Sequence, residues 1–356
     1  MEPIPTRFLI ISDTHALEIP PEPHAHHHAD VAIHCGDLTE ESKLAEFRTS
    51  LELLLSLDAP LKLVIAGNHD FTLDIPIFKK KVKEAWPPLE PELVTREYGH
   101  WGEARQLLER AKAKGVIYLE EGTHRFVLEN GAALTVYASP FTPSVGDWGF
   151  QYHPRYGHDF VLEQDTDVVI THGPPKGIMD LTDSRLRAGC PDMFSAIARN
   201  RPKMHCFGHI HEGWGAMLIT WKDKPSEQPS HFTSIAKSVV VQNLAGLKKL
   251  KFDDKVTAVE KACKLDDYLR DRYYRAIHSS NAEHPLRDGK HTLFVNAAIK
   301  GPREGELQPS WLVDIELQPA NANTTESAEV VTVGKRKAED DDDDKSDSSN
   351  KFQRLS

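Results

Sequence analysis

Side chains that can bind metal ions follow short apolar stretches of this 356-residue sequence. They are carboxylates, imidazoles and one side-chain amide, and no thiolate is among them: Asp13, His15, Asp37, Asn68, His69, His172, His209 and His211. Oxygen and nitrogen donors of this kind suit Mn, Fe, Zn or Mg ions. One ion needs fewer donors from the protein, so we predict two divalent ions that share a bridging carboxylate. Two neighbouring cations would clamp a phosphate ester and turn a bridging water into a hydroxide nucleophile, with a free histidine to protonate the leaving group.

Apolar runs predict the strands that must position these side chains. The runs cover residues 8–12, 31–35, 61–66, 167–171 and 203–207. Their near-continuous apolar character is typical of buried parallel strands, and open α/β sheets place their chemistry at the carboxyl ends of such strands. Because side chains two residues apart share a face of an extended segment, we expect Asp13 and His15 to point the same way. The same spacing recurs in His209 and His211.

The segments between these strands show helical and strand patterns. Residues 40–57 carry leucine and phenylalanine at helical spacing, with Thr39 as a plausible cap, and this predicts the crossover helix between the second and third strands. Further helices are expected near residues 75–85 and 103–114. Strands are expected near residues 125–128, 134–138, 291–296 and 311–317, of which the last two would close a second sheet.

An aromatic loop after the predicted strand 134–138 carries Trp148 and Phe150. Two interpretations stay open: the rings cover the edge of the core, or they form a wall of the substrate site. We name both residues as candidate substrate-binding residues, because a nucleotide base could stack on either ring.

We expect one domain over residues 1–317, with a charged, partly helical insertion at about 216–290 that is helical through residues 255–277. Residues 318–356 turn polar and acidic and predict a disordered, low-complexity tail. The histidine-rich loop at residues 20–28 is interpreted as a solvated irregular loop, because nothing fixes the geometry of its rings.

Composition argues against some binding partners and some cellular locations of the protein. The formal net charge of −11 argues against DNA or RNA as the main partner. No stretch reaches the length of a membrane span, and the first residues show no secretory signal pattern. The four cysteines lack paired or zinc-finger spacing, so we expect reduced core residues of a cytoplasmic protein. A nuclear address at Lys335–Lys337 is the alternative location.

The motifs D-x-H, G-D, G-N-H-D, H-G-P-P and G-H-x-H follow one another over roughly residues 6 to 213. This ordered set resembles the calcineurin-like metallophosphoesterase superfamily, and the residues around the motifs look like its metallophosphoesterase-domain-containing (MPPED) subgroup, which is similar to class III cyclic-nucleotide phosphodiesterases. The resemblance implies an α/β fold, a four-layer sandwich of two facing mixed β-sheets flanked by helices. It also implies ligands for a first ion: Asp13, His15, Asp37 and His211. Asn68, His172 and His209 would complete the second site, with Asp37 as the bridge and His69 as general acid and phosphate partner.

The resemblance also bears on the substrate. Protein serine/threonine phosphatases of the superfamily extend the second motif to G-D-x-x-D-R-G, whose arginine holds the phosphate, whereas this chain reads Gly36-Asp37-Leu38-Thr39-Glu40-Glu41-Ser42. Some members of the subgroup replace the first histidine of G-H-x-H and are weak enzymes, but His209 is present here. We therefore expect a phosphodiesterase for nucleotides or other small phosphodiesters, with Asn68 and His69 as catalytic residues and Mn²⁺ as the expected ion in vitro. The alternatives are a phosphomonoesterase or protein phosphatase, a non-catalytic metal- or nucleotide-binding protein, and a scaffold that acts through the insertion and tail.

Overall fold

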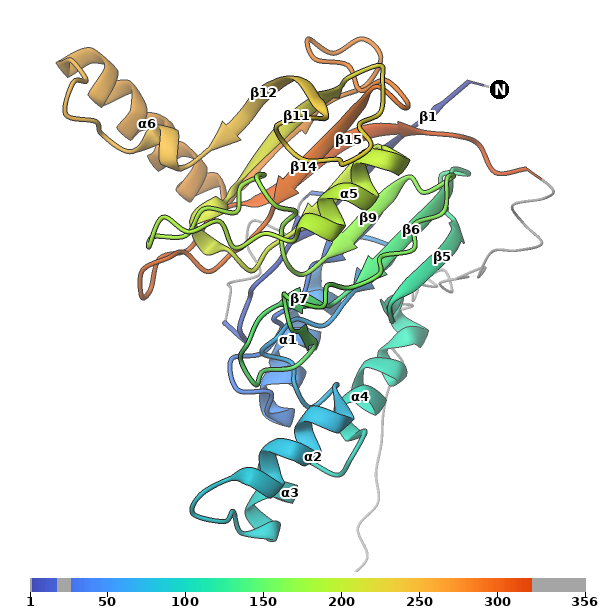
Figure 1. Ribbon diagram of the computed structural model, residues 1–356, viewed down its shortest axis with the longest axis vertical. Helices are drawn as coiled ribbons and strands as arrows, with labels where there is room; N and C mark the ends of the chain where they lie inside the picture. Colours follow the sequence, from blue (N-terminus) through green and yellow to red (C-terminus); the bar gives the residue numbers. More distant parts are fainter. Residues whose placement is uncertain (1, 18–26, 322–356) are drawn as a thin grey trace, which may run out of the picture.

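Two β-sheets face each other in the computed structural model, which describes residues 2–17 and 27–321 (Figure 1). The first sheet has six strands in the order β13-β15-β1-β2-β3-β4: Tyr273–Ile277, Ser310–Leu317, Ile4–Ile11, Val31–His34, Leu61–Val64 and Val116–Tyr118. The second has seven in the order β12-β11-β14-β10-β9-β6-β5: Ile235–Asn243, Gly215–Trp221, His291–Asn296, Met204–Phe207, Val168–Thr171, Ala133–Ser139 and Gly122–Val127. Each sheet combines parallel and antiparallel neighbours.

The protein has four layers, with buried apolar side chains packed between them. Side chains of both sheets, such as Ile33 and Ile170, form the core between them. Helices α1 (Leu44–Ser56) and α4 (Glu103–Ala111) pack on the outer face of the first sheet. Helix α5 (Pro191–Asn200) packs on the outer face of the second. This arrangement confirms the predicted α/β sandwich of two facing mixed sheets flanked by helices.

The remaining elements lie at the periphery. Helix α2 (Ile75–Glu84) was expected, whereas α3 (Pro91–Tyr98) was not, and both lie below the sheets in Figure 1. Helix α6 (Lys255–Asp271) projects away from the sheets (Figure 1). The short strands and 3-10 turns are β7 (Thr142–Pro143), β8 (Gln151–Tyr152), η2 (Lys112–Lys114), η3 (His211–Gly213) and η4 (Ala245–Leu247).

The expected start of the first helix was wrong by one turn. Helix α1 begins at Leu44, and Lys43 rather than Thr39 occupies its N-cap position. The Thr39 hydroxyl instead donates a hydrogen bond to the carboxylate of Asp70 (2.7 Å). Thr39 is therefore part of the loop that follows β2, and the backbone N–H of Lys43 is capped by Glu46 (3.0 Å).

The segment at 216–290 contributes strands to both sheets. Strand β11 pairs with β14, and β13 pairs with β15. The helix expected through residue 277 ends at Asp271, and Tyr273–Ile277 is a strand. The strand expected at 311–317 was assigned to the wrong sheet, because β15 pairs antiparallel with β1 in the first sheet.

Two predicted segments lie at least partly outside the described residues. Residues 18–26, with most of the histidine-rich loop, lie outside the described residues, as do residues 322–356 with Lys335–Lys337 and the acidic run. Cys35, Cys190 and Cys206 are buried, as expected, whereas Cys263 is exposed on α6 and is not a core residue.

A buried histidine in β10 makes the stability of the fold depend on pH. His205 is fully buried, and burial lowers its pKa to about 3. In the unfolded chain the pKa of this histidine is about 6.5. Between about pH 6.5 and about pH 3 the unfolded state therefore binds one more proton than the folded state, and the free energy of unfolding falls as the pH falls. We expect His205→Gln to reduce the change of the unfolding free energy with pH by about 1.4 kcal/mol per pH unit. The measurement is the free energy of unfolding in urea at about pH 6 and about pH 4. His124→Gln, at a half-buried position on β5, should keep the wild-type slope, and the prediction fails if His205→Gln keeps it too.

Candidate metal centre

The loops after five parallel strands converge at one edge of the two facing sheets. Strands β1, β2 and β3 of the first sheet lead to Asp13, Asp37 and Asn68, while β9 and β10 of the second lead to His172 and His209. Hydrogen bonds connect the loops, for example from the backbone N of Asp13 to the carbonyl O of Gly36 (2.9 Å). The backbone N of His209 donates to both carboxylate oxygens of Asp13 (3.1 and 3.0 Å), which joins the second sheet to the first.

The converging side chains form three overlapping groups of candidate metal ligands. Within each group, one ligand atom per residue lies within 4.8 Å of the others. The groups are Asp13, His15 and His211; His15, Asp37 and His69; and Asp37, His172 and His209. His15 and Asp37 are each shared by two groups, so the donors form one continuous cluster rather than separate sites.

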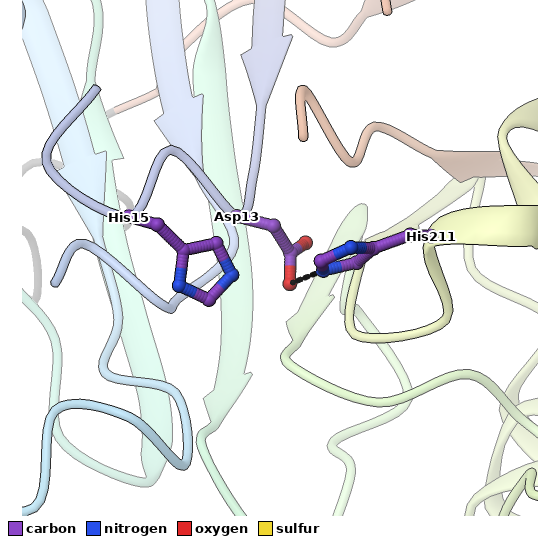
Figure 2. A group of neighbouring side chains, drawn as sticks. All are labelled: Asp13, His15 and His211. Carbon is purple, nitrogen blue, oxygen red and sulfur yellow. Dashed lines mark ion pairs between the residues drawn. The ribbon is translucent and has the colours of Figure 1, made fainter. Parts of the chain in front are cut away.

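The first group carries a buried nitrogen that suits a metal ion (Figure 2). Asp13 is fully buried, and its Oδ1 lies 3.4 Å from His211 Nε2, the pair joined by the dashed line. His15 Nε2 is buried and has no hydrogen-bond partner in the described part of the chain. The other ring nitrogen, Nδ1, lies 3.1 Å from the carbonyl O of Thr39 and must donate to it. Nε2 is therefore an unprotonated acceptor in the neutral ring, as metal ligation requires.

The third group is tied together around His172. Its Nε2 lies 3.3 Å from Asp37 Oδ2 and 3.0 Å from Asn68 Oδ1, which brings Asn68 into the cluster. Its Nδ1 lies 3.0 Å from the carbonyl O of Cys35, so Nδ1 is the donor and Nε2 faces the oxygen atoms. The His209 ring lies against His172, with ring centroids 4.8 Å apart. Backbone carbonyls that orient histidine in this way are typical of metal sites.

Asp37 belongs to the second and third groups and also lies near His15 of the first group. Its Oδ2 is 3.8 Å from His15 Nε2 and 3.3 Å from His172 Nε2, and its Oδ1 accepts a hydrogen bond from the backbone N of His69 (2.8 Å). The ring of His69 is held by its Nδ1, which lies 2.6 Å from the carbonyl O of Glu40. One carboxylate with an imidazole on either side is the arrangement that two neighbouring cations could share.

The charges of the cluster are coupled. Burial alone would raise the pKa of Asp13, but the hydrogen bond and charge of His211 outweigh burial and lower it well below the usual range. Burial would likewise lower the pKa of His172, but the Asp37 carboxylate raises it to about 9. Burial and the His172 charge lower the pKa of His209 to about 4. The buried carboxylates thus favour a positive charge in their midst, as expected of residues that bind cations.

The local backbone differs from the extended geometry expected from the spacing of two. Asp13, His15 and His209 have positive φ angles of 53°, 47° and 64°. Asp37 is also left-handed, with φ at 54°. The side chains therefore do not converge by sharing one face of a strand, and His209 and His211 fall into different groups. Left-handed backbone at a non-glycine residue costs about 1–3 kcal/mol and is concentrated at functional sites.

Two motif glycines leave room for the carboxylates of other motifs. A Cβ atom added to Gly208 would overlap the carboxylate of Asp13, and one added to Gly67 would overlap that of Asp37. Each glycine thus allows the backbone of one strand end to approach an aspartate from another. This explains why glycine precedes Asn68 and His209.

Asp70 is a positioning residue that the sequence did not identify. Its carboxylate accepts hydrogen bonds from the backbone N of Gly67 (2.8 Å), Leu38 (3.1 Å) and Thr39 (3.0 Å), and from the Thr39 hydroxyl. Burial and the Asp37 charge raise its pKa to about 6. Asp70 therefore connects the loop that carries Asp37 to the loop that carries Asn68.

We expect Asp70→Asn to weaken metal binding by about tenfold to a hundredfold, because an amide cannot accept from four donors. The measurement is competition for Mn²⁺ with a fluorescent chelator. Asp180→Asn is the matched control, since Asp180 is also a buried carboxylate that accepts backbone N–H groups, from Gly177 and Gly189. Equal affinity in Asp70→Asn and Asp180→Asn would contradict a positioning role.

A cavity of about 300 Å³ opens over the cluster. Its lining consists of cluster residues and four further residues: His15, Asp37, Asn68, His69, His209 and His211, with Glu40, Glu212, Lys300 and Pro302. Trp148 and Phe150 are not in this lining. Trp148 packs on His69, with ring centroids 4.3 Å apart, and Phe150 lies against Phe141, with centroids 5.9 Å apart. Their binding of substrate stays a prediction.

None of the helices in residues 2–17 and 27–321 combines the length and apolar character that a membrane span requires.

A family profile and a curated relative agree with the motifs. The sequence profile of the calcineurin-like phosphoesterase family matches residues 6–213. Human Metallophosphoesterase domain-containing protein 1 is 33% identical over 219 residues, which are 60% of this chain and 62% of that protein. Probable rhamnogalacturonate lyase C of Emericella nidulans is 35% identical over 220 residues, 60% of this chain but 18% of that protein. The crystal structure of TT1561 of Thermus thermophilus has 11% identity and a TM-score of 0.35, over 58% of this chain and 82% of that one. The match thus spans about three-fifths of the length of the human relative.

Proposed function

Because the chain belongs to the calcineurin-like phosphoesterase family, we propose that it hydrolyses phosphoesters with two divalent metal ions and acts on nucleotides or other small phosphodiesters. The observation that carries the proposal is the position of Asp37, a buried carboxylate between the imidazoles of His15 and His172. The buried Nε2 of His15, which has no hydrogen-bond partner in the described part of the chain, supports it.

We assign the ligands by adding Asp37 to the first group and Asn68 to the third. Asp13, His15, Asp37 and His211 would hold one ion, and Asp37, Asn68, His172 and His209 would hold the other. When bound, the two ions would withdraw charge from the phosphoryl oxygens and make water a stronger acid. Mn²⁺ is the ion we propose for assays in vitro, and metal analysis of the purified protein would identify the native ions.

His69 is proposed as the general acid. The carbonyl O of Glu40 can only accept a hydrogen bond, so His69 Nδ1 carries a proton in the neutral ring. When the ring is protonated, Nε2–H can donate its proton to the departing oxygen of the substrate. Trp148 lies on the ring face and Glu40 at its edge, and together they hold the orientation of His69. Asn68, the neighbour of His69, would contact the phosphate as well as an ion.

The test of the proposal is hydrolysis of bis-nitrophenyl phosphate and mono-nitrophenyl phosphate with added Mn²⁺. We expect faster turnover of the diester, because the chain lacks the arginine with which protein phosphatases hold a phosphate. Turnover of the monoester alone would contradict diesterase activity. If neither compound is hydrolysed, the proposed enzyme function fails, and a metal- or nucleotide-binding protein becomes the better interpretation. We also propose a cytoplasmic location, which fractionation of cells that express the protein would test.

We expect Trp148→Ala to raise KM for nucleotide substrates about tenfold, and to raise KM for nitrophenyl esters less, because base stacking on an aromatic ring contributes about 1–3 kcal/mol. A change in the orientation of His69 would lower kcat for both classes, so KM is the informative quantity. Trp86→Ala is the control, since Trp86 is 90% exposed and, unlike Trp148, makes no ring contact with His69 in the described part of the chain. An equal change of KM for both classes would contradict a stacking role.

A further inference from the structure

Lys300 is the only lysine or arginine among the described residues that line the cavity over the cluster. It follows strand β14 and lies outside residues 6–213, which the family profile matches. Glu40 and Glu212 also line the cavity, so Lys300 provides a positive charge beside two glutamates.

The backbone of Lys300 is fixed against the candidate metal ligands. Its N donates a hydrogen bond to the carbonyl O of Asp13 (3.2 Å), so the chain after β14 runs alongside the loop after β1. Gln308 donates through Nε2 to the carbonyl oxygens of Lys300 (3.3 Å) and His211 (3.0 Å). The base of the lysine side chain therefore keeps a fixed place beside Asp13 and His211.

The ammonium group, in contrast, has a replaceable partner. Lys300 Nζ lies 2.6 Å from Glu40 Oε2, and the two side chains are 31% and 45% exposed. An ion pair between side chains this exposed contributes little to stability and can be exchanged for another anion. Glu40 Oε2 lies 3.3 Å from His15 Nδ1, the ring nitrogen opposite to the one that is near Asp37. The ammonium group is thus paired with a carboxylate that lies at the side of the His15 ring opposite to Asp37.

We propose that Lys300 forms a subsite for a second anionic group of the substrate, a phosphate separate from the one that is hydrolysed. The inference rests on the proposed function. The ammonium group of Lys300 lies at the side of the His15 ring opposite to Asp37, and this position points to a second group of the substrate rather than to the reacting phosphate. A phosphate would replace Glu40 as the partner of the ammonium group, because it offers more oxygen atoms and more charge than one carboxylate. The preferred substrates are then nucleotides with two separated phosphates.

Titration calorimetry of the full chain, with its metals as purified, tests the subsite. The probes are thymidine 5′-phosphate and thymidine 3′,5′-bisphosphate, which differ in one phosphate. We expect the wild-type protein to bind the bisphosphate about tenfold more tightly, which is the usual effect of one charged hydrogen bond. Lys300→Gln should bind both probes alike, and Lys300→Arg should keep most of the preference. Lys237→Gln, which removes an equal charge from an exposed position on β12, should behave as wild type.

The proposal is overturned if the wild-type protein does not distinguish the probes, or if Lys300→Gln keeps the wild-type ratio of the two dissociation constants. Turnover of the nitrophenyl ester of thymidine 5′-phosphate, measured in parallel, reports on the hydrolase function. Absence of turnover in the wild type would count against that function, while the ratio of dissociation constants would still decide whether Lys300 forms the subsite.

Discussion

Asp37→Asn should lower kcat by on the order of a thousandfold and reduce the metal content of the purified protein. Asp37 lies between His15 Nε2 and His172 Nε2, at 3.8 and 3.3 Å, so both proposed ions depend on its charge. Asparagine has nearly the same shape, but it is neutral and would present an NH₂ group to one of its neighbours. The measurements are turnover of bis-nitrophenyl phosphate and metal analysis of the dialysed protein.

Asp223→Asn is the control for Asp37→Asn, because it removes an equal charge from an exposed carboxylate outside the cavity lining. Thermal unfolding of both variants would show whether they fold. A folded Asp37→Asn protein that keeps the wild-type metal content and a rate within about threefold of wild type would refute the bridging role.

The convergence of the donors could be predicted from the sequence because it follows from strand ends. Apolar runs identify β1, β2, β3, β9 and β10, and parallel strands in facing sheets bring their carboxyl ends to one edge. The local geometry could not be predicted. Asp13 and His209 adopt left-handed backbone, which is uncommon for residues other than glycine, and the contacts that hold them there come from distant loops.

The errors in the expected elements have local physical causes. The helix expected through residue 277 ends earlier because Arg272 adopts the left-handed conformation (φ 56°) that usually belongs to glycine after a helix. Without glycine or proline the sequence carries no stop signal there. Thr39 has the side chain of a helix cap, but its hydroxyl binds Asp70, which is distant in sequence.

Long-range pairing also explains why Lys300 was not predicted. It reaches the site because residues 298–300 run beside residues 12 and 13, with the N of Ile299 bonded to the carbonyl O of Ser12 (2.8 Å). No periodicity or motif near Lys300 encodes that pairing. Asp70 is a similar case. The G-N-H-D motif does not show from which backbone N–H groups its carboxylate will accept hydrogen bonds.

His69→Ala should lower kcat by about a hundredfold to ten-thousandfold for substrates with an alcohol leaving group, without loss of bound metal. The effect on nitrophenyl esters should be much smaller, because nitrophenolate is a weak base and leaves without a proton. The backbone N of His69 still donates to Asp37 Oδ1 in this variant, so the position of the proposed bridge is preserved. The measurement compares kcat for a methyl nitrophenyl phosphate diester and for a dinucleotide, with metal analysis of the same samples.

The comparison of leaving groups separates the two roles that the geometry allows for His69. A ring nitrogen of His69 lies within 4.8 Å of ligand atoms of His15 and Asp37, so the residue could also be a metal ligand. A lost ligand would lower metal content and slow both substrates equally, whereas a lost acid slows only the substrate whose leaving group needs a proton. His124→Ala, in which a half-buried imidazole that is bonded to the carbonyl O of Glu120, outside the cavity lining, is removed, is the control. Equal rate losses for both leaving groups, accompanied by loss of metal, would assign His69 to the metal site and leave the general acid to be found among the other residues that line the cavity.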